Sequence, residues 1–161
     1  MTKRQKALSR TWNRSKYESG GGVFQEVKDI WVVDDDEEMS RAVGLMLKLL
    51  ECDVTTFHNV RSAAQNFAGG KKPDLLILDI NMPEISGLDM VEFLRRRADT
   101  KELPIVMLSS EATDIIVDRA IELGADAYVM KPVTIEELEK AMASAFYKRL
   151  NLKAEQVKDG K

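Results

Sequence analysis

The 161 residues carry 24 basic and 27 acidic side chains, a net charge of −3, and 44% are hydrophobic, which suits one globular domain with polar ends. No apolar run approaches the ~20 residues of a membrane-spanning helix, and the basic start of the chain lacks the apolar core of a secretory signal. A single cysteine excludes an internal disulfide, so we expect a cytoplasmic protein with no membrane partner.

The charge is divided unevenly along the chain. Residues 1–22 hold six basic side chains and one acid, and residues 148–161 hold five and two, so 23–147 retain 13 basic and 24 acidic side chains. The acidic segment 23–147 would repel duplex DNA and attract a cation. We therefore do not expect nucleic acid as a partner. We predict that residues 1–28 form a flexible basic arm and linker, because they are polar and contain three consecutive glycines.

From about Val23 onward, strand patterns alternate with helix patterns. Short runs rich in apolar and β-branched residues predict strands at 30–33, 54–57, 75–78, 105–108 and 127–130. Helices are predicted at 39–50, 60–67, 88–97, 113–123 and 135–149. Five strand-then-helix units in succession predict an α/β fold with a doubly wound parallel sheet and right-handed crossovers.

Two of these helices begin with a recognisable signal. Ser86 lies three residues before Asp89, and Thr134 lies three residues before Glu137. This spacing is typical of capping boxes at helix starts and indicates where the third and fifth helices begin. Gly124 follows the fourth helix and suits its C-terminal end.

Chemically active side chains follow four of the five predicted strands. The first strand is followed by Asp34, Asp35 and Asp36, the third by Asp79, the fourth by Ser109 and Ser110, and the fifth by Lys131 and Pro132. Ligands of open parallel sheets bind beyond the carboxyl ends of the strands. We therefore expect acids, a hydroxyl and a cation to meet at one edge of the sheet.

The acids at this edge require a counter-ion, because neighbouring carboxylates disfavour one another's charged form. Oxygen ligands suit Mg²⁺, and the chain has one histidine and one cysteine, too few for a zinc site. Lys131 adds a fixed positive charge. With Mg²⁺ and Lys131 both present, a carboxylate can act as a nucleophile toward phosphorus. Asp79 is the natural choice for this nucleophile, because it stands alone after a central strand.

The segments VVDDD, LLILDINMPEISGLD, PIVMLSSEA and GADAYVMKPVTIEEL resemble the receiver domain of two-component response regulators. The resemblance covers residues 29–150 and leaves 151–161 as a C-terminal tail. It implies a flavodoxin-like (βα)5 fold with strand order 2-1-3-4-5. It also implies a stand-alone signalling switch rather than an enzyme, supporting only its own phosphorylation and dephosphorylation.

The resemblance further implies a role for each acid. Asp79 would accept a phosphoryl group from the phosphohistidine of a histidine kinase or a histidine phosphotransfer protein. Asp35, Asp79 and the backbone carbonyl of Asn81 would hold Mg²⁺, or Mn²⁺ in its place, with Asp34 acting mainly through water. Asp36 extends the acidic pair, and we expect it to cap the following helix.

The resemblance implies that three further residues sense the phosphoryl group. Ser109 and Lys131 would contact its oxygens, and the peptide bond between Lys131 and Pro132 would be cis. Ser109 and Tyr128 would form the switch. Output would pass to a partner protein or to a homodimer through the helices 113–123 and 135–149 and the strand 127–130.

Leu45 and Leu49 widen the apolar stripe of the first predicted helix beyond what core packing needs. Two hypotheses account for them equally well. The helix forms a ridge for docking a histidine kinase or phosphotransfer domain, or the segment around Val23 and Phe24 folds over it.

Three alternatives compete with a stand-alone receiver. The chain could be a receiver fragment of a larger regulator or hybrid kinase. An aspartyl-nucleophile phosphatase would need a second acid two residues after the nucleophile, where this chain has Asn81. A flavin carrier would need a Ser/Thr/Gly-rich phosphate loop after the first strand, and five acids there would repel the cofactor.

Overall fold

The computed structural model describes residues 28–111 and 113–160, so the predicted arm lies almost wholly outside the described residues. Strands and helices alternate through the described part of the chain. Their bounds are β1 Asp29–Val33, α2 Glu37–Leu49, β2 Asp53–Phe57, α3 Val60–Ala68, β3 Leu75–Asp79, α4 Gly87–Arg96, β4 Ile105–Ser109, α5 Asp114–Leu123, β5 Ala127–Met130 and α6 Ile135–Asp159. Each predicted element is present, with ends that differ by at most two residues except for α6.

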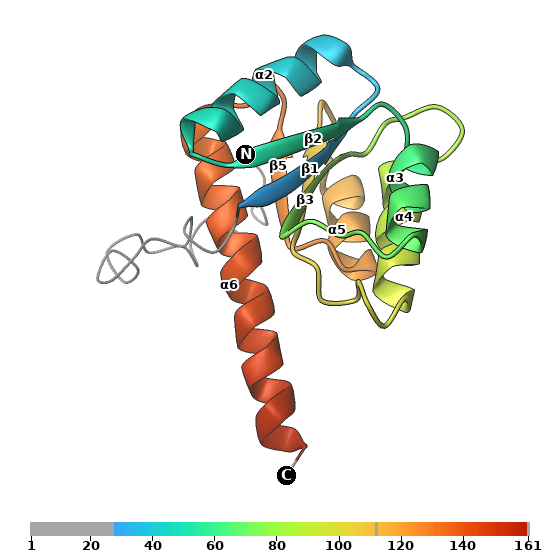
Figure 1. The fold of residues 1–161 in the computed structure, drawn as a ribbon, viewed down its shortest axis with the longest axis vertical. Coiled ribbons are helices and arrows are strands. Elements are labelled where there is room, and N and C mark those ends of the chain that lie inside the picture. The colour runs from blue at the N-terminus through green and yellow to red at the C-terminus, as the bar shows by residue number, and fades with distance from the viewer. Residues whose placement is uncertain (1–27, 112, 161) are drawn as a thin grey trace.

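The five strands form one parallel sheet in the order β2-β1-β3-β4-β5. Helices α3, α4 and α5 cover one face of the sheet, while α2 and α6 cover the other (Figure 1). This arrangement confirms the predicted doubly wound α/β fold and its strand order. Strand order reverses beside β1, where β1 lies between β2 and β3.

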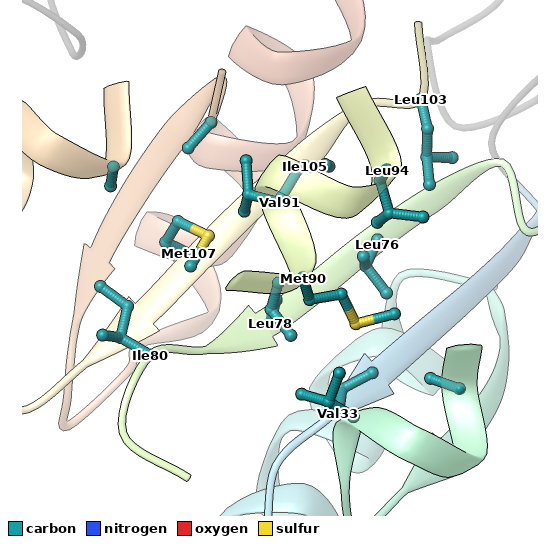
Figure 2. Packing of buried hydrophobic residues seen from close by; sticks show 14 of the residues in the cluster. Val33, Leu76, Leu78, Ile80, Met90, Val91, Leu94, Leu103, Ile105 and Met107 are labelled. Carbon is teal, nitrogen blue, oxygen red and sulfur yellow. The ribbon is translucent and has the colours of Figure 1, made fainter. Parts of the chain in front are cut away.

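The core consists of two apolar layers, one on each face of the sheet. On one face, Leu76, Leu78 and Met107 pack against Met90 and Leu94 of α4 (Figure 2). On the other face, alternate strand residues such as Ile30, Val32 and Ile77 pack against α2 and α6. The inner strands β3 and β4 are buried at every position, which explains their continuous apolar sequences.

The helix ends follow the predicted signals. Ser86 and Asp89 form a reciprocal capping box at the start of α4. The Thr134 hydroxyl accepts a hydrogen bond from the backbone N–H of Glu137 at the start of α6. Gly124 ends α5 with a left-handed φ of 114°, a conformation that glycine adopts without strain.

Helix α6 is longer than its sequence pattern predicted. The expected end at Arg149 was wrong, because the helix continues to Asp159 and spans 25 residues. Its last turns project beyond the sheet (Figure 1). Apolar periodicity fades near Leu150, but the following residues are mostly good helix formers, and no glycine or proline interrupts them before Gly160. No described helix, α6 included, is long and apolar enough to cross a membrane.

Candidate functional site

The three predicted acids meet at the carboxyl edge of the sheet. Val33 of β1 pairs with Leu78 of β3, so Asp34 and Asp79 extend from neighbouring strands at the same level. One carboxylate oxygen each from Asp34, Asp35 and Asp79 lies within 4.8 Å of the others. Asp34 and Asp79 are buried, whereas Asp35 is exposed to solvent. The cluster therefore has two buried members and one that faces outward.

Asp34 is held in place by its own neighbourhood. Its backbone N–H donates to the carbonyl of Phe57 in β2 at 3.0 Å, and its Oδ1 accepts the N–H of Asp36 at 3.0 Å. The Asp36 carboxylate accepts the N–H of Met39 at 3.1 Å and caps α2, as predicted. Hydrogen bonds that fix the turn after β1 thus leave Asp34 Oδ2 free to face Lys131.

Lys131 connects the two buried acids. Its ammonium nitrogen lies 2.9 Å from Asp34 Oδ2 and 3.3 Å from Asp79 Oδ1. Its backbone N–H donates to the carbonyl of Ser109 at 2.9 Å, and the peptide bond to Pro132 is cis, as expected. The side chain therefore reaches from the end of β5 across β4 to the tips of β3 and β1.

The site retains excess negative charge even with Lys131 in place. Burial raises the pKa of Asp79 to about 6, and the nearby charge of Asp34 adds to the rise, while Lys131 opposes it. Burial alone would lower the pKa of Lys131, but hydrogen bonds and attraction to Asp34 and Asp79 outweigh it, so that pKa is raised. One ammonium group thus offsets only part of the charge of a cluster of three carboxylates, which favours a bound cation.

The donor set fits a hard divalent cation. All three donors are carboxylate oxygens, the ligands that Mg²⁺ prefers, and the exposed position of Asp35 leaves room for the waters that Mg²⁺ keeps. Asn81 follows β3 by two residues with its side chain exposed, and its carbonyl stays a predicted ligand.

Ser109 and Tyr128 are linked through the backbone of Glu111. Ser109 is buried at the end of β4, and its hydroxyl oxygen accepts the N–H of Glu111 at 3.0 Å. The Tyr128 hydroxyl donates to the carbonyl of the same residue. The two predicted switch residues therefore form hydrogen bonds with the N–H and the carbonyl of the same loop residue, Glu111.

Gly87 is a feature of the site that sequence reasoning missed. A side-chain Cβ at this position would lie 2.1 Å from the carbonyl oxygen of Asp79 and 3.0 Å from the Cα of Ile80. The Gly87 N–H donates to the Ile80 carbonyl at 2.9 Å. The missing side chain thus lets the start of α4 pack directly against the backbone that carries Asp79. Its place in the loop after Asp79 was the available signal.

A second charged cluster, also missed, lies at the opposite edge of the sheet. The Asp126 carboxylate is fully buried before β5 and lies 2.9 Å from Arg95 of α4 and 2.7 Å from Arg149 of α6. It also accepts the N–H of Ile105 at 2.9 Å. This cluster ties two helices on opposite faces to the sheet, and it shares no residue with the acidic site.

The raised pKa of Asp79 leads to a prediction for stability. A carboxyl group whose folded pKa is about 6 instead of 3.8 destabilises the fold at pH above 6, and the penalty disappears as the pH falls through 3.8. In EDTA, Asp79→Asn is therefore expected to be more stable than the wild type at pH 7.5 by up to about 3 kcal/mol. Urea denaturation between pH 4 and 8 measures the difference. Asp36→Asn, which keeps the cap, serves as the control, and a gain that grows toward low pH would contradict the assignment.

The two leucines outside the core stripe are exposed on α2. Leu45 is 59% and Leu49 is 76% accessible to solvent. The alternative hypothesis, in which Val23 and Phe24 cover them, concerns residues outside the described part of the chain. Within the described part of the chain, both leucines are therefore accessible to a docking partner.

Comparison with known proteins supports the same interpretation. Residues 30–143 match the family model described as "Response regulator receiver domain". A two-component response regulator of rice, ORR21, is 33% identical over 83% of this chain and 19% of its own length. The phosphate regulon regulator PhoB of Rhizobium meliloti is 36% identical over 68% of this chain and 48% of its own length. This chain thus spans a fifth to a half of these two relatives.

Two solved structures share the fold. A putative response regulator from Chloroflexus aurantiacus has a TM-score of 0.71 at 28% identity, covering 74% of this chain and 98% of its own. The chemotaxis response regulator CheY4 of Vibrio cholerae has a TM-score of 0.68 at 27% identity, covering 74% and 98%. The sheet order, the acidic edge and these matches agree, and the chain belongs to the receiver domain family of two-component response regulators.

Proposed function

We propose that this receiver domain accepts a phosphoryl group on Asp79 in a Mg²⁺-dependent reaction and thereby changes its binding to a partner. The observation that carries the proposal is the position of Lys131, whose ammonium group lies between Asp34 and Asp79. An ammonium group at this point neutralises part of the charge of an incoming phosphoryl group. We also propose that the protein is located in the cytoplasm.

The transfer requires an in-line attack by one Asp79 carboxylate oxygen on the phosphorus of a phosphohistidine. The new O–P bond forms as the P–N bond breaks, and the electron pair of that bond stays on the imidazole nitrogen. Lys131 would then exchange part of its contact with Asp79 for a phosphoryl oxygen. Asp34 and Asp35, with the carbonyl of Asn81, would hold a Mg²⁺ that neutralises charge on the phosphoryl oxygens.

The switch would begin at Ser109. Its hydroxyl must turn toward the phosphoryl group to donate a hydrogen bond, which weakens its present bond to the N–H of Glu111. Tyr128 holds the carbonyl of Glu111, so a displaced Glu111 would release or redirect the Tyr128 hydroxyl. Phosphorylation would thus shift an equilibrium between two arrangements of this loop.

Incubation with Mg²⁺ and acetyl phosphate tests the acceptor directly. We expect the wild type to gain the mass of one phosphoryl group and Asp79→Asn to gain none. Asp36→Asn is the matched control, because it removes an acid from the same segment but retains the cap of α2. Equal labelling of the wild type and Asp79→Asn would show that another residue accepts the phosphoryl group. Labelling in EDTA would show that the reaction does not require a divalent cation.

Output would pass through the surface formed by α5, β5 and α6. Ile115 of α5 and Met130 of β5 are exposed there, at 81% and 38% accessibility. We propose this surface as the site of a downstream protein or of a second copy of the chain. The kinase or phosphotransfer protein would bind at α2, beside the acidic site.

Introducing positive charge on the exposed apolar residues of α2, Leu45 and Leu49, tests the kinase contact. In Leu45→Lys with Leu49→Lys, phosphotransfer from a histidine kinase or phosphotransfer domain is expected to slow at least tenfold, since two desolvated apolar contacts are lost. Labelling by acetyl phosphate, which needs no docking, should stay at the wild-type rate. Unchanged transfer from the protein donor would remove α2 from the interface.

A further inference from the structure

Helix α2 carries one hydroxyl group in the stripe that it buries against the sheet. Its buried residues are Ser40, Val43 and Leu47, which are spaced by three and four residues. This spacing predicts an apolar side chain at each of the three positions. Ser40 is only 3% exposed, whereas the adjacent Arg41 and Ala42 are exposed to solvent. The helix therefore buries a polar group at a position where core packing requires an apolar one.

A serine at this position carries a cost that alanine would avoid. Alanine is the most favourable residue in a helix, and serine is less favourable because its hydroxyl competes for backbone groups. A hydroxyl that is buried without a hydrogen bond costs further free energy. The presence of Ser40 must therefore be explained by the hydrogen bond that its hydroxyl makes.

That hydrogen bond connects α2 to the acidic site. The Ser40 hydroxyl donates to the backbone carbonyl of Asp34 at 3.3 Å. Of residues 28–111 and 113–160, none donates its backbone N–H to this carbonyl. Asp34 is fully buried, so water does not replace a missing donor there. Ser40 thus provides the hydrogen bond that the buried carbonyl needs.

The bond fixes the peptide group that joins Asp34 to Asp35. A peptide group is planar, so a hydrogen bond to its carbonyl also limits the position of the following Cα. The Asp34 side chain is held separately, because its Oδ1 accepts the N–H of Asp36. Asp35 is exposed and provides one of the three clustered carboxylates. The position of the Asp35 carboxylate relative to the other two therefore depends on the peptide that Ser40 holds.

We propose that Ser40 is a positioning residue for a divalent cation, acting through the peptide between Asp34 and Asp35. The inference rests on the proposed function, in which these two acids hold Mg²⁺. Without the hydroxyl, the buried carbonyl loses its partner and the peptide can rotate toward another donor. The Asp35 carboxylate then occupies several positions, few of which match the octahedral geometry that Mg²⁺ demands.

Binding of Mn²⁺, measured by electron paramagnetic resonance without a phosphoryl donor, tests this role. Ser40→Ala is expected to raise the Kd of Mn²⁺ about five- to tenfold, because a hydrogen bond that supports the metal ligands is lost. Ser40→Cys has nearly the shape of serine but only a weak donor, so it should bind Mn²⁺ as weakly as Ser40→Ala.

Ser144→Ala is the matched control, since it removes a hydroxyl from α6 and should keep the wild-type Kd. A Kd for Ser40→Ala within about twofold of the wild type would overturn the proposal. Wild-type binding by Ser40→Cys would also overturn it, because the volume of the side chain and not its hydroxyl would then be what matters.

Labelling by acetyl phosphate separates positioning from a general loss of structure. Ser40→Ala should need about five- to tenfold more Mg²⁺ for half-maximal labelling, yet reach the wild-type rate at saturating Mg²⁺. A rate that no Mg²⁺ concentration restores would contradict a role confined to the cation site. If Asp79 were not the acceptor, Asp79→Asn would still be labelled, whereas the Mn²⁺ affinities of the Ser40 variants would not change.

Discussion

Asp126→Asn is expected to lower the free energy of unfolding by about 3–5 kcal/mol, the cost of removing one partner from a buried ion pair. The Asp126 carboxylate is fully buried, and it provides the negative charge for the largely buried guanidinium groups of Arg95 and Arg149. Burial already lowers the pKa of Arg95 to about 10, and Asp126 opposes that shift. Asparagine would leave two neighbouring positive charges without a counter-charge. Urea denaturation at pH 7 measures the loss.

Asp99→Asn is the matched control for this prediction. Asp99 pairs with Arg97 at 3.0 Å on the surface, where water screens the interaction. Its replacement should leave the unfolding midpoint close to that of the wild type. If Asp126→Asn were as mild as this control, the buried cluster would contribute little, and its role in joining α4 and α6 to the sheet would be wrong.

Gly87→Ala is expected to destabilise the protein and disturb the acidic site, because its added Cβ would lie 2.1 Å from the Asp79 carbonyl oxygen. The atoms in its way belong to the backbone and cannot turn aside, so the start of α4 must move away from β3. Overpacking of this kind costs about 1–3 kcal/mol. It would also displace Asp79, so we expect weaker Mg²⁺ binding and slower labelling by acetyl phosphate. Urea denaturation and labelling rates measure the two effects.

Gly44→Ala is the control, with an effect of opposite sign. Gly44 lies within α2, and an added Cβ would have no atom within 4 Å. Alanine in a helix interior is favoured over glycine by about 0.5–1 kcal/mol, so this variant should be more stable than the wild type. A Gly87→Ala protein as stable as Gly44→Ala would show that α4 can shift without cost.

The acidic site was predictable because a parallel sheet places the ends of its strands at one edge. Asp34, Asp79 and Lys131 each follow an apolar run, and this position alone indicates which edge they share. Their contacts were not predictable to the same degree. The sequence gives no reason for Lys131 to lie closer to Asp34 than to Asp79, as its 2.9 and 3.3 Å distances show.

The Asp126 cluster had no signal in the sequence. Asp126 contacts Arg95 and Arg149 across 31 and 23 residues of chain. Charged residues at such separations have no periodicity, and each of them alone resembles a surface residue. The extra length of α6 was missed for a related reason, since an exposed helix that packs against little has no apolar stripe to mark its end.

The amino-acid sequence by itself determined the order of strands and helices, the helix caps and the chemical groups at the strand ends. These features depend on neighbours within a few residues, on which apolar periodicity and capping act. The tertiary structure alone decided which charges became partners, how closely α4 approaches Asp79 and which apolar surfaces stayed exposed. Those depend on distances between segments far apart in the chain, which are fixed only when both faces of the sheet are packed.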